Sequence, residues 1–188
     1  MSSILRHRQP TPTGVDVSLC KADTLLVTRT ERFQGDEFVL RRATPSDAAT
    51  LAALAFRSKA SWGYDDAFMD KARPALETPA EYLESSPVFL LERHGGDVIA
   101  FFGFKTIGDD IFLHDFFVAP EMIGRGLGAR LWTLAVETAR EQHCPSFLIA
   151  SDPFAKGFYQ HMGAQQIGEI EATETGRLLP LLRYTMPL

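Results

Sequence analysis

The spacing of apolar residues indicates strands in the first part of the chain. The segment FVLRRA at 38–43 alternates as a half-buried strand does. Three further runs, VFLLERH, DVIAFFGFK and IFLHDFFV, follow between 88 and 118 and are separated by the short turns GG and GDD. Because short glycine turns between apolar runs are typical of hairpins, we expect an antiparallel meander of three strands here.

Two helices are expected between the first strand and this meander. The segment Thr44-Pro45-Ser46-Asp47 has a capping residue, a proline in the first turn and an acid three residues later, which is typical of a helix start. Apolar and small residues then recur at helical spacing, at Leu51, Leu54, Ala55 and Ser58. Trp62-Gly63-Tyr64 ends this helix, and a second helix is predicted over 65–75.

The pattern after residue 120 becomes α/β. A glycine-rich turn leads into a helix with one apolar face, formed by Leu127, Leu131, Leu134, Ala135 and Thr138. SFLIA at 146–150 predicts a buried strand parallel to the preceding one, because a helix connects the two. A helix over 152–162 and two strands, QQIGEI and LLPLLRYTM, follow. We predict an α/β (α+β) fold with helices flanking a mixed central sheet of six to seven strands.

The length of 188 residues fits one domain. Residues 1–36 contain prolines and scattered charges without a sustained period, so we interpret them as an N-terminal extension with one edge strand at 23–29. The domain itself is predicted at 37–188.

The net charge of the chain limits the classes of partner that it is expected to bind. Lys and Arg number 19 and Asp and Glu 24, which gives a formal charge of −5 without any basic run. This argues against nucleic acid as a partner. Cys20 and Cys144 lack the spacing of a zinc site or a disulfide framework, and we expect no metal. No apolar run approaches the ~18 residues of a membrane helix, so a soluble cytoplasmic protein without a membrane partner is expected.

Three glycines between a predicted strand and a predicted helix are the strongest chemical signal. Gly124, Gly126 and Gly128 allow backbone N–H groups to turn toward one point, where the helix N-terminus adds partial positive charge. This combination favours a pyrophosphate. The spacing Gly124-x-Gly126-x-x-Ala129, with Asp152 after the next strand, also fits a dinucleotide (NAD) fingerprint. That interpretation is weaker, because five residues separate the strand from Gly124 and the upstream strands are antiparallel.

The segment from Ile123 to Gly128, IGRGLG, follows a strand ending in Val-Ala-Pro and resembles the GNAT superfamily of acyl-CoA-dependent N-acyltransferases. The segment from Asp152 to Tyr159, DPFAKGFY, is similar to a second motif of that superfamily. The resemblance extends over about residues 38–188. Ile123 and Asp152 depart from the superfamily pattern, which usually has a polar residue and an Asn there. The segments SKxxWGY and GRxLP also look like those of a bacterial GNAT subgroup.

The resemblance implies a GNAT fold and acetyl-CoA as cosubstrate, with no metal. Phe116, Phe117 and Val118 would pair with the pantetheine arm. The pyrophosphate would lie against the turn and helix start, formed by Ile123, Gly124, Arg125, Gly126, Leu127, Gly128 and Ala129. Asp152 and Ala155 complete the implied cofactor-binding set. The thioester would then lie where two strands diverge.

Transfer to an amine requires the neutral amine, which favours a general base. His114 is the first candidate, because an imidazole is largely neutral at pH 7 and strand alternation places it on one face with Phe112 and Phe116. Asp115, on the other face, is the alternative base. Tyr159 matches the superfamily's tyrosine that protonates the departing CoA thiolate.

Residues that bind the acceptor are expected in the segments that vary within the superfamily. Lys59 and Arg177 would clamp a carboxylate or phosphate, and Trp62 and Tyr64 would wall an apolar or cationic pocket. The expected function is acetyl transfer to a primary amine, most simply of a small molecule, by direct attack in a ternary complex. Transfer to a protein N-terminus or lysine and non-catalytic acyl-CoA binding or sensing are the alternatives. The superfamily also suggests a homodimer.

Overall fold

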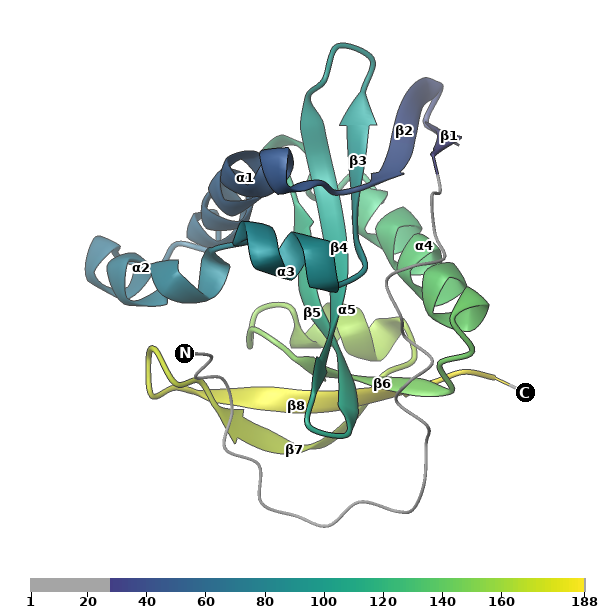
Figure 1. Cartoon of the computed structure of the whole chain (residues 1–188). Coiled ribbons are helices and arrows are strands. Elements are labelled where there is room, and N and C mark those ends of the chain that lie inside the picture. The colour runs from purple at the N-terminus through teal and green to yellow at the C-terminus, as the bar shows by residue number, and fades with distance from the viewer. Residues whose placement is uncertain (1–27, 188) are drawn as a thin grey trace.

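An eight-stranded sheet forms the centre of the computed structural model, which describes residues 28–187 (Figure 1). The strands are β1 (Arg29–Phe33), β2 (Asp36–Arg42), β3 (Val88–Arg93), β4 (Val98–Ile107), β5 (Asp110–Val118), β6 (Ser146–Ala150), β7 (Gln165–Glu171) and β8 (Leu178–Thr185). Their order across the sheet is β1-β2-β3-β4-β5-β6-β8-β7. Among the described strands, the neighbours β5 and β6 run parallel and the other pairs antiparallel. The predicted mixed sheet is confirmed.

The sheet has more strands than the six or seven expected, because β1 pairs with β2 ahead of the predicted domain start. Residues 29–33 were expected in the N-terminal extension, yet Arg29 pairs with Leu40 at one end of β1 and Phe33 with Asp36 at the other. Part of the expected extension therefore belongs to the sheet. Cys20 and residues 23–27 of the expected edge strand lie outside the described residues.

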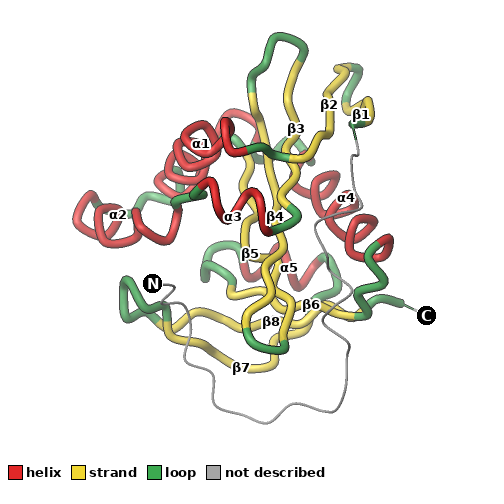
Figure 2. The backbone as a smooth tube through the Cα atoms, viewed as in Figure 1, coloured by secondary structure: helices red, strands yellow, loops and turns green. Residues whose placement is uncertain are grey.

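Helices cover both faces of the sheet. They are α1 (Ala48–Ala60), α2 (Asp66–Ala72), α3 (Ala80–Ser85), α4 (Leu127–Glu141) and α5 (Lys156–His161), with short 3-10 turns η3 (Pro45–Asp47), η4 (Arg73–Leu76) and η5 (Pro120–Met122). Figure 1 shows α1, α2 and α3 on one face and α4 and α5 on the other. In Figure 2 the strands β6, β8 and β7 lie crosswise to β3, β4 and β5, so the sheet is strongly twisted. No helix in the described part of the chain has the length and apolarity needed to cross a membrane.

Three helical segments differ from expectation, and one of them is α5, which begins at Lys156 and not at Asp152. The sequence does not predict α3, which is only 6 residues long. The second helix expected over 65–75 divides into α2 and η4. Pro74 lies at this division, and its missing N–H cannot continue the hydrogen bonding of an α-helix.

The main core is rich in phenylalanine. Fully buried rings come from five positions on the strands, Phe38, Phe89, Phe101, Phe102 and Phe147. On α4 the predicted apolar face is confirmed, because Leu127, Leu131, Leu134, Ala135 and Thr138 are all buried. The core thus fixes the start of α4 against β4 and β5.

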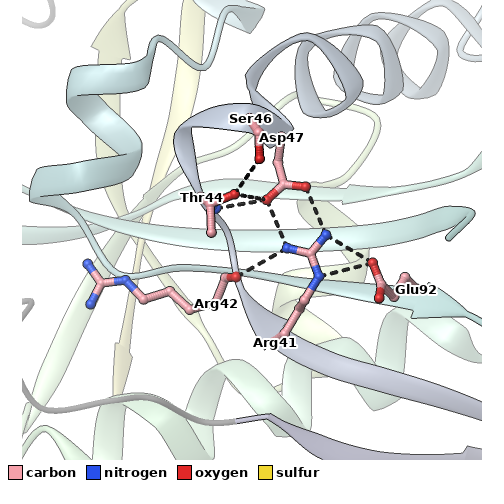
Figure 3. Close-up of polar contacts among 6 residues, drawn as sticks. All are labelled: Arg41, Arg42, Thr44, Ser46, Asp47 and Glu92. Atoms are coloured by element: carbon pink, nitrogen blue, oxygen red, sulfur yellow. Dashed lines mark hydrogen bonds and ion pairs between the residues drawn. The ribbon is translucent and has the colours of Figure 1, made fainter.

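Arg41 anchors the start of α1. Its guanidinium donates two hydrogen bonds of 2.8 Å to the carboxylate of Asp47 and one of 3.0 Å to Glu92 (Figure 3). The backbone N–H and the hydroxyl of Thr44 also donate to Asp47. The hydrogen bonds from Arg41, aided by those from Thr44, outweigh burial and lower the pKa of Asp47 to about 2. The predicted helix start is confirmed as the turn η3, which continues directly into α1.

Candidate active site

A cleft of about 520 Å³ opens where β5 and β6 diverge. The two strands pair at Phe112 and Leu148, and beyond this point both line the cleft. Residues Phe116–Val118 pair with β4 along one edge, whereas no described strand pairs with their other edge. Because each unpaired peptide offers a donor and an acceptor, this edge suits an extended ligand that carries amides.

The glycine-rich turn before α4 lines the same cleft. Gly124 and Gly126 adopt φ angles of 78° and 85°, in the left-handed region that residues with a side chain rarely occupy. α4 begins directly afterwards, at Leu127. The first N–H groups of a helix have no partner within it, and the helix dipole adds partial positive charge there. The turn therefore has the geometry of an anion site.

The β1–β2 hairpin contacts this turn without lining the cleft. Gln34 Nε2 donates a hydrogen bond of 2.7 Å to the carbonyl oxygen of Arg125. The ring of Phe33 lies 3.6 Å from the point where a Cβ on Gly126 would stand. The hairpin therefore supports the outer side of the glycine-rich turn, a contact that the sequence does not reveal.

Tyr159 of α5 lies in the wall of the cleft. Its ring packs against Phe116 and Trp132, with 5.8 Å between ring centroids in each pair. Burial, with a smaller effect of the negative charge of Asp152, raises the pKa of the Tyr159 phenol. Tyr159 therefore keeps its proton at neutral pH, and its hydroxyl is a hydrogen-bond donor in the wall of the cleft.

His114 lies at a bulge in β5. Gly103 of β4 pairs with Asp115 and Phe104 pairs with Leu113, so His114 between them has no partner on β4. A second cavity, of about 170 Å³, opens beside the large cleft, and His114 lines both. The imidazole thus lies where the two cavities meet.

The bulge corrects one prediction for this strand. Phe112 belongs to a small apolar cluster that includes Leu148, whereas Phe116 packs against the main core. A bulge inserts an extra residue and shifts the side-chain alternation beyond it. The prediction that Phe112, His114 and Phe116 share one face is therefore wrong.

Asp115, the alternative base, lines neither of these two cavities. It is 4% exposed, and the Tyr82 hydroxyl of α3 donates a hydrogen bond of 2.5 Å to its Oδ2 atom. Burial raises the pKa of Asp115 against the opposing effects of His114 and of the Tyr82 hydrogen bond. Sequence reasoning missed Tyr82, because the short helix that carries it has no recognisable pattern.

Asp152 lines both cavities. A hydrogen-bond network connects it to three of the predicted acceptor-binding residues. Lys59 Nζ donates a hydrogen bond of 2.8 Å to its carboxylate, and the Tyr64 hydroxyl donates at 2.9 Å. Arg177 Nη1 in turn donates at 2.5 Å to the Tyr64 oxygen. Burial alone would raise the pKa of Asp152, but Lys59 and the other donors outweigh it and lower that pKa.

Trp62, the fourth predicted acceptor-binding residue, lines the large cleft and is 41% exposed. Its ring stacks on that of Phe154, with 5.7 Å between centroids. Phe154 is 54% exposed. Sequence reasoning did not single it out, because one apolar residue in a turn forms no pattern.

The predicted cofactor-binding residues line the large cleft with two exceptions, Arg125 and Leu127. Leu127 is 1% exposed and packs in the core, whereas Arg125 is exposed and contacts the β1–β2 hairpin through its carbonyl oxygen. Within residues 28–187, no group of three or more His, Cys, Asp or Glu side chains is placed to hold a metal ion.

Comparison with known proteins identifies similar folds. The model of the acetyltransferase (GNAT) family matches residues 53–164. A GCN5-related N-acetyltransferase from Rhodopseudomonas palustris is 17% identical, with a TM-score of 0.65 over 78% of this chain and 94% of that one. Comparison with curated protein sequences finds no match.

Two further solved structures carry more specific names. PaiA N-acetyltransferase from Thermoplasma acidophilum, in complex with coenzyme A, is 14% identical, with a TM-score of 0.61 over 79% of this chain and 99% of that one. The ribosomal-protein-S18-alanine N-acetyltransferase from Escherichia coli is 15% identical, with a TM-score of 0.57 over 80% and 95% of the two chains. At this identity the likeness shows the shared fold alone.

Proposed function

Because this chain belongs to the acetyltransferase (GNAT) family, we propose that it transfers the acetyl group of acetyl-CoA to a primary amine of a small molecule. The cleft between β5 and β6 carries this proposal. It joins an unpaired strand edge at Phe116–Val118, a glycine-rich turn at a helix start and the buried Tyr159. The strand edge suits the amides of the pantetheine arm, and the turn suits the pyrophosphate.

His114 is the proposed general base. It lines both cavities, so an amine in the smaller one and a thioester in the larger one would meet beside its ring. The amine nitrogen forms a bond to the carbonyl carbon of the acetyl group, and His114 takes up the proton that this nitrogen loses. Asp115 is shielded from both cavities and is proposed to support His114 rather than to contact the amine.

Tyr159 is the proposed donor to the leaving group. As the bond between carbonyl carbon and sulfur breaks, the electron pair stays on sulfur, and a phenol at hydrogen-bond distance stabilises the thiolate by donating to it. Burial raises the pKa of Tyr159 and keeps the phenol protonated, so Tyr159 acts on the thiolate as a hydrogen-bond donor and not by giving up its proton.

Thiol release from acetyl-CoA in the presence of a panel of primary amines tests the proposal. We expect turnover by the native protein and a loss of about 10²–10⁴-fold in kcat for Tyr159→Phe, the usual size of such a contribution. His114→Ala should also change the pH dependence of the rate. The matched control is Tyr184→Phe, because Tyr184 contacts the same Trp132 ring but lines neither cavity.

The alternative of a non-catalytic acyl-CoA-binding module predicts a different result. Such a module would bind CoA but release no thiol with any amine. Unchanged turnover in Tyr159→Phe would contradict the role of Tyr159, and binding of CoA without turnover would contradict enzymatic transfer.

A further inference from the structure

The cavity of about 170 Å³ lies next to the proposed acetyl-CoA cleft and opens toward the same reacting region. The two share six lining residues, Lys59, Leu113, His114, Ala150, Asp152 and Leu179. A molecule in the smaller cavity would therefore reach His114 without entering through the cofactor cleft. The residues that line the smaller cavity therefore indicate the chemistry of the acceptor.

Of the two cations expected to clamp an anion, Lys59 is already neutralised. Its Nζ lies 2.8 Å from the Asp152 carboxylate, and both side chains are largely shielded from solvent, at 19% and 14% exposed. A buried ion pair of this kind is not free to bind a second anion without leaving a charge unpaired. The expectation that Lys59 and Arg177 act together as a clamp is therefore not supported by their contacts.

Arg177 differs from Lys59 in having no acid partner among the residues that the structure describes. One guanidinium nitrogen donates to the Tyr64 oxygen, and the group lies over the rings of Tyr64 and Phe68, 5.2 and 5.7 Å from their centroids. These contacts hold the guanidinium in place without an ion pair to an acid of the described residues. A guanidinium has five N–H donors, so further donors remain for a ligand.

The remaining wall of the cavity combines apolar groups with one acid. Its apolar side chains include Phe68, Leu76, Phe112 and Leu179. Glu174, on the turn between β7 and β8, also lines it and likewise forms no ion pair with the described residues. One cation and one acid that form no ion pair within the described residues, beside apolar surface, complement a ligand that carries both charges and an apolar body.

We propose, on the basis of the acetyl transfer proposed above, that the acceptor is a free amino acid with an apolar side chain. Its carboxylate would pair with Arg177, its side chain would contact the apolar wall, and its amine would face His114. Glu174 would attract the ammonium form of the amine into the cavity before the proton is lost. A peptide N-terminus fits less well, because it has an amide where Arg177 requires a carboxylate.

Three amines that carry the same side chain test this inference. They are L-leucine, which has a carboxylate, L-leucinamide, which has an amide in its place, and 3-methylbutylamine, which has neither. We measure kcat/KM for acetylation of each, with a leucyl dipeptide as the peptide probe. The native protein is expected to prefer L-leucine over each of the others by at least about tenfold, because only L-leucine offers a carboxylate to the guanidinium of Arg177. Arg177→Gln should lower kcat/KM for L-leucine by at least about tenfold more than it lowers kcat/KM for 3-methylbutylamine, so that the preference is lost. Arg183→Gln, on β8 away from both cavities, is the matched control.

The outcomes separate this inference from the proposed function. Acetylation of 3-methylbutylamine or the dipeptide at least as fast as L-leucine would overturn the amino-acid inference, and so would an equal loss on all probes in Arg177→Gln. Turnover with other amines but none of these probes would overturn it as well, while leaving acetyl transfer in place. A protein that acetylates no amine at all would contradict the proposed function itself.

Discussion

The hydroxyl of Tyr82 donates a hydrogen bond of 2.5 Å to Asp115, a carboxyl group that is buried directly beside His114 in the chain. The rings of Tyr82 and His114 also meet edge to face, with 5.6 Å between centroids. Burial, then the charge and the hydrogen bond of Asp115, raises the pKa of Tyr82, so the phenol remains the donor. The short helix α3 thus holds Asp115, the residue that follows the proposed base His114 in the chain.

Tyr82→Phe should lower the free energy of unfolding by about 1–3 kcal/mol, because it leaves a buried carboxyl oxygen without its donor. Denaturant unfolding monitored by tryptophan fluorescence measures this change. The same substitution at Tyr184 removes a hydroxyl that has no such partner among residues 28–187 and should change stability by less than about 0.5 kcal/mol. Equal effects of the two variants would contradict the importance of the Tyr82–Asp115 hydrogen bond.

Gly103→Ala should destabilise the same region by about 1–3 kcal/mol through overpacking. A Cβ at this position would lie 2.7 Å from the Tyr82 hydroxyl oxygen and 3.0 Å from both Asp115 Oδ2 and Val88 Cγ2. Gly168→Ala on β7 is the control, because its Cβ would meet nothing within 4 Å. Thermal unfolding of the two variants compares them directly, and a Gly103→Ala protein as stable as the control would show that the packing is looser than described.

The carboxyl group of Asp47 should make the free energy of unfolding depend on pH in the acid range. Its pKa falls from an ordinary 3.8 to about 2 in the folded chain, so the contribution is complete above about pH 4 and is lost as the pH falls through 2. We expect it to be about 1–2 kcal/mol, because Arg41 is a quarter exposed and solvent screens the pair. Urea unfolding of Asp47→Asn should show a smaller loss of stability between pH 4 and pH 2 than the native protein shows. Asp109→Asn, at an exposed turn, should keep the native slope.

Gly126→Ala should weaken binding of CoA by up to about tenfold. At a φ of 85° an added side chain is strained by roughly 1–2 kcal/mol, and relief of this strain moves N–H groups away from the pyrophosphate. Gly96→Ala introduces similar strain at the β3–β4 turn, where φ is 93°, and should leave the Kd for CoA unchanged. Isothermal titration with CoA distinguishes the two, and equal Kd values would show that the turn is not part of the CoA site.

The regular elements could be predicted from sequence because their patterns are local. The apolar face of α4, the glycine turns of the β3–β5 meander and the start of α1 each lie within a short window of residues. The glycine-rich turn was found in the same way, since Gly124 and Gly126 are needed for its positive φ angles.

What the sequence could not predict depends on contacts between distant segments. The bulge at His114 lies between the pairs Gly103–Asp115 and Phe104–Leu113 of two neighbouring strands. The hydrogen bond from Tyr82 reaches a carboxyl group 33 positions away. The neutralisation of Lys59 by Asp152 joins residues 93 positions apart. No local pattern encodes such pairs, and they decide which of the candidate site residues are available to a ligand.

Thermal unfolding of the purified protein with acetyl-CoA, CoA and NAD in parallel tests the central claim most directly. A ligand at 100 times its Kd stabilises the folded state by about 2.7 kcal/mol, which corresponds to a shift in Tm of roughly 5–10 °C for a chain of this size. We predict such a shift with acetyl-CoA and with CoA and none with NAD. A shift with NAD alone, or with none of the three, would contradict the assignment of the cleft between β5 and β6 to acetyl-CoA.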